Sequence, residues 1–156
     1  MRIVNTSEDI FLMPKGDHAA VCVTTNGCIK RNGHAVMGAG IAKQADDLFH
    51  IAPELGERMQ KYGNRCYKMG PFVHAGKTYA IITFPTKHDW RDNSDLDLII
   101  KSCCELLLLC ELSGYDEVYL TPPGCGLGNL DWEGTVRPAI EHMLDDRFTI
   151  VMRQNA

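Results

Sequence analysis

Two glycine-rich segments contain the residues whose types and spacing could do chemistry. Of the 14 glycines in the chain, three fall within 33–40 (GHAVMGAG) and three within 124–128 (GCGLG). Glycine lets the backbone approach a ligand closely, and amide N–H groups at the start of a helix bind anions without any basic side chain. Either segment alone is equally well explained as a tight turn with positive φ. Two such segments at one edge of a sheet would instead bind two phosphate groups.

The common phosphate, metal and nucleophile motifs are missing from the sequence. No GK[ST] follows either glycine segment, and neither has the GxGxxG spacing of a redox dinucleotide site. The sequence shows no serine-nucleophile elbow, no Cys/His nucleophile signature and no paired carboxylates of a glycosidase. Histidines at 34, 50, 74 and 142 lack metal-ligand spacing. We therefore expect neither a metal nor another cofactor.

Strand and helix patterns alternate along the chain and place both glycine segments after strands. We expect strands at 2–5, 19–25, 65–74, 77–84, 117–121 and 148–152, with Ala75-Gly76 joining the third and fourth into a hairpin. We expect helices at 41–50, 54–62, from an N-cap at Ser94 to Gly114, and at 133–144 with Pro138 as a late first turn or a kink. This alternation predicts an α/β fold, a three-layer α/β/α sandwich with a mixed central sheet. In such folds, ligands bind where the carboxyl ends of strands lead into helices.

Composition describes one globular domain over residues 1–156. The chain is 45% hydrophobic and 23% charged, with a formal charge of −4. This mild acidity argues against a protein that coats nucleic acid, although local contact with DNA stays open. Seven cysteines without a CxxC pair are typical of reduced thiols, and the first eleven residues do not have the pattern of a signal peptide. We expect a cytoplasmic protein. We expect no membrane span, because Lys101, Glu105 and Glu111 keep the apolar run at 106–110 too short to cross a bilayer.

Five segments, in this order, resemble the macro domain, the ADP-ribose-binding α/β/α module. They are SEDIF (7–11), VTTNG (23–27), VMGAGIA (36–42), ITFPTK (82–87) and GCGLGNLDW (124–132). Together they span nearly the whole chain. They are most similar to the branch that contains the terminal ADP-ribose protein glycohydrolase and the antitoxin that removes ADP-ribose from thymidine in DNA. The resemblance implies a macro-domain fold, ADP-ribose or an ADP-ribosylated macromolecule as partner, and a bacterial or phage source.

The resemblance also implies which residues would contact ADP-ribose. Asp9 would accept a hydrogen bond from the adenine amino group beside Ile10, although Glu8 stands where the family usually has glycine, and a capping role competes for Asp9. Asn26 would lie near a ribose, unless it is only a turn residue before Gly27. The other implied contacts are Gly38, Ala39, Gly40 and Ile41 on one side of the diphosphate, Gly124, Cys125, Gly126, Leu127 and Gly128 on the other, and Thr83, Pro123 and Asn129.

Lys87 is the catalytic residue that the resemblance implies. Its segment, FPTKHDW, is similar to the lysine segment of the DNA-directed branch. A neutral lysine amine could attack the anomeric carbon of the distal ribose and form a ring-opened, Schiff-base-type adduct, or its ammonium could stabilise the departing group. His88 and Arg91 could supply charge beside it or contact a phosphate of a nucleic acid. The competing interpretation is an ordinary solvated loop lysine.

One departure from the family bears on turnover. The protein-directed glycohydrolase has an acidic residue after GCGL, where this chain has Gly128 and then Asn129. The nearest carboxylate is Asp131, which we expect to cap helix 133–144, while Trp132 packs in the core. Cys125 is not expected to be a nucleophile.

Three functions follow from these residues. The leading hypothesis is an ADP-ribosyl glycohydrolase that removes mono-ADP-ribose from DNA or protein. The alternatives are a non-catalytic ADP-ribose-binding module and a phosphatase that acts on ADP-ribose 1″-phosphate. Segment 28–35 is longer than in the glycohydrolases, and we interpret it as a flexible lid without an assigned role.

Overall fold

The computed structural model describes residues 1–154, and its strands form a single mixed sheet. The strand order is β1-β6-β5-β2-β4-β3. All neighbouring strands run parallel except β3 and β4, which form the predicted hairpin. Their bounds are β1 (Arg2–Thr6), β2 (Ala19–Thr25), β3 (Lys68–His74), β4 (Lys77–Pro85), β5 (Glu117–Leu120) and β6 (Phe148–Arg153).

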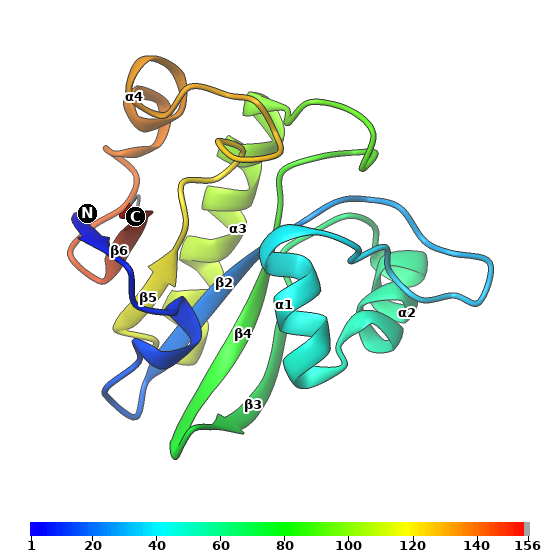
Figure 1. Cartoon of the computed structure of the whole chain (residues 1–156), viewed down its shortest axis with the longest axis horizontal. Coiled ribbons are helices and arrows are strands. Elements are labelled where there is room, and N and C mark those ends of the chain that lie inside the picture. Colours follow the sequence, from blue (N-terminus) through cyan, green and yellow to red (C-terminus); the bar gives the residue numbers. More distant parts are fainter. Residues whose placement is uncertain (155–156) are drawn as a thin grey trace.

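Helices cover both faces of this sheet, which confirms the three-layer α/β/α architecture (Figure 1). Along β2, Val21 and Val23 face one hydrophobic cluster and Ala20 and Cys22 face the other, because successive side chains of a strand point to opposite faces. The first cluster includes residues of α1 (Gly40–Phe49) and α2 (Ala52–Tyr62), and the second includes residues of α3 (Leu96–Ser113) and α4 (Arg137–Ile140). A 3-10 turn, η1 (Ile10–Leu12), precedes β2.

The start of α3 differs from the prediction by one residue. Its N-cap is Asp95, whose Oδ1 accepts a hydrogen bond from Asp97 N at 3.0 Å, and not Ser94. Ser94 is buried beneath the second glycine segment, where its N–H donates to Gly128 O at 3.0 Å. Both Ser and Asp side chains can cap a helix. The contact of Ser94 with Gly128 leaves Asp95 as the cap of α3. Gly114 ends α3 in a left-handed conformation, as predicted.

The prediction of a regular helix over 133–144 is wrong. Residues Trp132–Val136 form a π-helical turn, η2, and only Arg137–Ile140 form α4. Pro138 has no N–H to donate to the carbonyl of Gly134, and its ring crowds that carbonyl. The bonds shift accordingly, so that Val136 N donates five residues back to Asp131 O at 3.0 Å.

Segment 28–35 packs against α2, so the structure does not support its interpretation as a flexible lid. Lys30 N donates to His34 O at 2.8 Å, and Ala35 N donates to Ala52 O at 2.9 Å. Gly56 lies directly beneath the segment, because a Cβ at that position would come within 1.9 Å of Gly33 O. The segment is therefore a fixed turn whose exposed tip carries Lys30 and Arg31.

Candidate functional site

Five strands of the sheet end at the same edge. Since β1, β6, β5, β2 and β4 are parallel, their carboxyl ends lie side by side and the segments that follow them meet there (Figure 1). Asp9 follows β1, Asn26 follows β2, and Lys87 comes two residues after β4. The second glycine segment follows β5. This edge is where ligands bind in open α/β sheets.

The two glycine segments touch each other, and Lys87 contacts the second one. A Cβ at Gly40, the first residue of α1, would lie 3.7 Å from Leu127 Cδ1. Lys87 Nζ donates to Leu127 O at 3.3 Å and to Trp90 O at 3.3 Å. The structure thus brings together the candidate lysine and both predicted phosphate-binding segments.

The glycines of these segments have two different roles. A Cβ at Gly128 would lie 2.0 Å from Ser94 Oγ and 2.5 Å from Gly124 O, and one at Gly124 would lie 2.8 Å from Ile99 Cδ1. Gly124 and Gly128 are therefore required for packing. Gly38 and Gly126, by contrast, have no atom within 4 Å of such a Cβ and border open space.

Several backbone amides of the two segments are available to an anion. Within residues 1–154, the N–H groups of Gly126, Leu127 and Gly128 donate to no backbone oxygen. The first N–H groups of α1 have no acceptor within their own helix, and the positive end of the helix dipole lies beside them. The amides of Cys125 and Asn129 are already used, since they donate to Pro122 O at 3.3 Å and Gly126 O at 3.2 Å.

Asp9 borders a hollow of about 330 Å³ at the same edge of the sheet. Its Oδ1 accepts from Phe11 N at 3.0 Å and caps η1. The predicted alternative role of Asp9 as a capping residue is therefore confirmed. Ile10 beside it is 5% exposed. The hollow brings together residues that follow β1 with residues of α1 and β6, which are far apart in the sequence; its other lining residues are Ser7, Phe11, Gln44, Asp47, Leu48 and Arg153. Sequence reasoning missed Gln44 and Arg153, because only the packing of α1 beside the ends of β1 and β6 places them there.

Comparison with known proteins found relatives among solved structures. No family model matches the chain, and no curated protein does. The macrodomain of Mycobacterium tuberculosis DarG is 24% identical with a TM-score of 0.72, covering 99% of this chain and 98% of that one. The macrodomain of Thermus aquaticus DarG is 22% identical with a TM-score of 0.69, covering 96% and 97%. The chain has the macrodomain fold. A Thermosipho africanus DarTG in complex with ADP-ribose is 20% identical with a TM-score of 0.73, and the match covers 97% of this chain but 41% of that one.

Two residues that the sequence predicted to contact a ligand make other contacts. Thr83 is completely buried; its Oγ1 accepts from Tyr67 N at 2.8 Å and donates to Arg65 O at 3.3 Å. We therefore do not carry Thr83 into the site. Asn26 bridges its own loop, with Nδ2 donating to Val36 O at 3.0 Å and Oδ1 accepting from Cys28 N at 2.9 Å. The second hydrogen of Asn26 Nδ2 could still donate to a ribose, so this contact stays a prediction.

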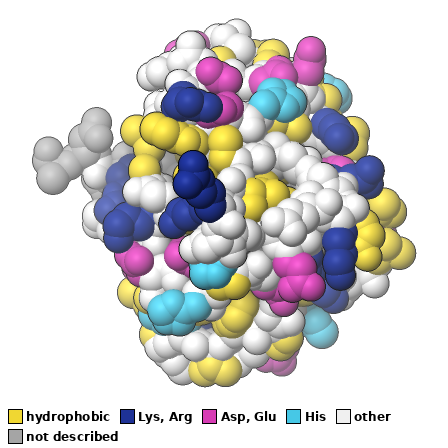
Figure 2. Space-filling model, turned by 90° about the vertical axis from the view of Figure 1, so that its right-hand side faces the viewer, with side chains coloured by type: hydrophobic (Ala, Val, Ile, Leu, Met, Phe, Trp, Pro, Cys, Tyr) yellow, Lys and Arg dark blue, Asp and Glu magenta, His cyan; other side chains and the backbone are white. Residues whose placement is uncertain are grey.

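His88 and Arg91, the two basic residues that follow Lys87, are each paired with a carboxylate. His88 Nε2 lies 2.8 Å from Asp95 Oδ2, and the hydrogen bond with His88 lowers the pKa of Asp95. Arg91 Nη2 donates to Asp89 Oδ2 at 2.7 Å. Neither cation is directed at Lys87 in the way the sequence suggested. Figure 2 shows basic and acidic side chains together on one face of the molecule.

Asp131 and Trp132 have the structural roles expected of them. Asp131 Oδ2 accepts from Gly134 N at 2.6 Å as the N-cap of η2, and Trp132 is 7% exposed in the core. The Cys125 thiol donates to Pro123 O at 3.3 Å, and burial raises its pKa to about 11. A thiol with this pKa is a poor nucleophile near neutral pH.

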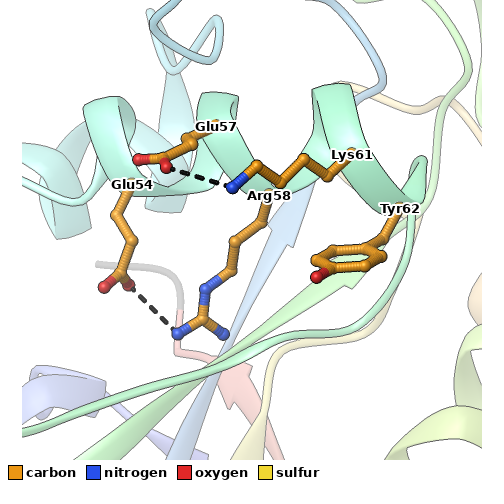
Figure 3. A pocket seen from close by; sticks show the side chains of 5 residues that line it. All are labelled: Glu54, Glu57, Arg58, Lys61 and Tyr62. Carbon is orange, nitrogen blue, oxygen red and sulfur yellow. Dashed lines mark ion pairs between the residues drawn. The ribbon is translucent and has the colours of Figure 1, made fainter.

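A second hollow, of about 220 Å³, lies beside α2 (Figure 3). Its charged side chains form the pairs Arg58–Glu54 at 3.7 Å and Lys61–Glu57 at 3.6 Å. Because these four charges are already paired along one helix, the hollow is an ordinary solvated surface. Within residues 1–154, no group of three or more His, Cys, Asp or Glu side chains is placed to hold a metal ion, and no helix is long and apolar enough to cross a membrane.

Proposed function

We propose that this macrodomain is an ADP-ribosyl glycohydrolase that removes mono-ADP-ribose from a macromolecular target. One observation carries the proposal: Lys87 Nζ lies 3.3 Å from Leu127 O, inside the loop whose free amides suit a diphosphate. The same lysine then has a fixed position relative to any ligand held by those amides. The Thermosipho relative, which is in complex with ADP-ribose, supports ADP-ribose as the ligand.

ADP-ribose fits the site in one direction. Adenine would occupy the hollow beside Asp9, with its amino group donating to the carboxylate. The diphosphate would lie between the N-terminus of α1 and the amides of Gly126 to Gly128, where the helix dipole and the N–H groups stabilise its charge. The distal ribose would then reach Lys87, with its anomeric carbon toward the target.

Two catalytic roles of Lys87 are compatible with this position. In the first, the neutral amine attacks the anomeric carbon, the bond to the target breaks, and the departing group takes the proton that the amine releases. The ring-opened Schiff base is then hydrolysed by water, which returns ADP-ribose and the free amine. In the second role, the ammonium stabilises the charge that develops on the departing group. Reduction with cyanoborohydride during turnover separates the two, because only the first leaves ADP-ribose attached to Lys87.

A second candidate function is an ADP-ribose-binding module without turnover. The position of Asp131 favours it, because this nearest carboxylate is engaged as a helix cap and the residue after Leu127 is glycine. Asp131 is then not free to assist hydrolysis of an adduct.

The test combines a binding and a turnover measurement on the same protein. ADP-ribose is titrated by calorimetry, and release of ADP-ribose is followed by chromatography from an ADP-ribosylated thymidine oligonucleotide and from an ester-linked ADP-ribosyl peptide. Binding together with release from at least one substrate is expected. Binding without release from either identifies a binding module, and absence of binding contradicts both functions.

A further inference from the structure

Trp90 is an exposed aromatic residue beside the candidate catalytic lysine. It is 54% exposed, whereas the other tryptophan, Trp132, is 7% exposed. Its carbonyl oxygen accepts from Lys87 Nζ at 3.3 Å, and the same ammonium contacts Leu127, which is 66% exposed. The backbone carbonyls of two residues with large, exposed apolar side chains therefore hold the Lys87 ammonium.

The loop holds its shape without burying this indole. Asp89 Oδ1 accepts from Arg91 N at 3.0 Å, and Asp92 N donates to Asp89 O at 3.1 Å. The ends of the loop are tied down by the bonds Asp95 N to Thr86 O at 2.9 Å and Asn129 Nδ2 to Asn93 Oδ1 at 2.9 Å. The indole is consequently presented on a fixed support and is not needed to maintain it.

Arg91 adds a second planar group at this point. Its guanidinium carbon lies 5.8 Å from the centroid of the Trp90 ring, within the range of a cation–π contact. The bidentate bond to Asp89 fixes the guanidinium and balances its charge. Together they offer a flat, polarisable surface with little net charge.

This surface suits a nucleobase better than a phosphate backbone. The loop carries three carboxylates against Lys87 and Arg91; the carboxylates are those of Asp89, Asp92 and Asp95. Stacking of a base on an aromatic ring needs no positive field, and unpaired bases are read by aromatic and guanidinium planes.

We propose that Trp90 is a specificity residue whose indole stacks on the nucleobase that carries the ADP-ribose group, in an unpaired nucleic acid strand. This inference rests on the proposed glycohydrolase function and assigns a residue that would select its target. Stacking is present before and during the reaction, so it contributes to binding and not to the chemical step.

The test compares Trp90→Ala, Trp90→Phe and a control variant, Tyr62→Ala. Tyr62 is also an exposed aromatic residue, at 64%, but lies on α2 beside the hollow of Figure 3. On the ADP-ribosylated oligonucleotide, Trp90→Ala is expected to raise KM by about 5- to 150-fold with kcat nearly unchanged, the cost of one lost base stack. Trp90→Phe and Tyr62→Ala should stay within about threefold of wild type.

Two further readouts separate failure of this inference from failure of the proposed function. The affinity of Trp90→Ala for free ADP-ribose, measured by calorimetry, should equal that of wild type. In Lys87→Ala protein, the oligonucleotide substrate should protect Trp90 fluorescence from acrylamide, and ADP-ribose alone should not. An unchanged KM for the oligonucleotide, or equal losses on oligonucleotide and peptide substrates, overturns the role of Trp90 while ADP-ribose binding and release stand.

Discussion

Lys87 differs from the neighbouring cations in what it contacts. His88 and Arg91 are bound to carboxylates, whereas the Lys87 ammonium donates to two backbone carbonyls. A carbonyl orients an ammonium without neutralising it, so the charge stays available to a ligand. The same two carbonyls belong to Trp90 and Leu127, which connects the lysine to the surface proposed to receive the leaving base.

At the scale of single residues, Cys125 should be chemically inert although it lies in the ligand loop. Burial raises the pKa of its thiol to about 11, so only a small fraction is thiolate at pH 8. With iodoacetamide at this pH, the exposed Cys104 should be modified well before Cys125, as peptide mass spectrometry can record. The variant Cys125→Ala should keep turnover within about threefold of wild type. Rapid alkylation of Cys125, or loss of activity with the fold retained, would contradict its structural role.

At the scale of elements, the second glycine segment offers a matched pair of substitutions. Gly128→Ala should destabilise the protein by about 1–3 kcal/mol, because its Cβ would come within 2.5 Å of the Gly124 carbonyl and still closer to Ser94 Oγ. Gly126→Val should leave the free energy of unfolding within about 0.5 kcal/mol of wild type, because it meets open space.

The same pair separates stability from binding. Gly126→Val places a branched side chain beside the free amides and should weaken ADP-ribose binding at least about tenfold. Urea unfolding and calorimetry on both variants measure the two effects. Equal stability of the two variants would contradict the packing contact beneath Gly128, and unchanged ADP-ribose affinity of Gly126→Val would contradict the anion site.

The sequence was sufficient to predict the layers, the mixed sheet, and the positions of Lys87 and both glycine segments after strands. These follow from local patterns and from the rule that parallel strands end at one edge. It was not sufficient to choose Asp95 over Ser94 as the cap of α3, because that choice depends on a contact with Gly128, far along the chain. The π-helical turn before α4 was missed for a different reason: Pro138 indicated a kink, but not how the hydrogen bonds would shift around it.

At the scale of the whole molecule, one carboxylate at the edge opposite the site should set part of the acid sensitivity. Glu117, at the start of β5, accepts from Lys15 N at 2.8 Å, from Gly16 N at 2.7 Å and from the hydroxyl of Tyr119. Burial alone would raise the pKa of Glu117, but these hydrogen bonds outweigh it and lower the pKa below its usual value.

The pH dependence follows from the direction of this shift. A carboxyl whose pKa is lower in the folded state stabilises the fold above its unfolded pKa of about 4.3, and this contribution is lost as pH falls through the folded value. Glu117→Gln should therefore cost about 1 kcal/mol at pH 7, allowing for solvent screening, and much less at pH 3. Urea unfolding at both pH values measures the difference, and an equal cost at both would contradict the role of the charge.

The formal charge of −4 is compatible with a nucleotide ligand, because the proposed anion site consists of backbone amides and a helix N-terminus. The charge is unfavourable for extended contact with a phosphate backbone, which leaves base stacking at Trp90 as the proposed means of holding a nucleic acid target. The glycine segments would bind the ADP-ribose, and the loop from Lys87 to Asn93 would select what it is attached to.

The most direct test of the proposed function is the rate of ADP-ribose release from the ADP-ribosylated thymidine oligonucleotide by wild type, Lys87→Ala and Lys101→Ala. Lys101 is an exposed lysine on α3 and serves as the control. Lys87→Ala is expected to lose at least about 100-fold in rate while it still binds ADP-ribose, and Lys101→Ala to match wild type. Release by Lys87→Ala at the wild-type rate would contradict the assignment of Lys87 as the catalytic residue.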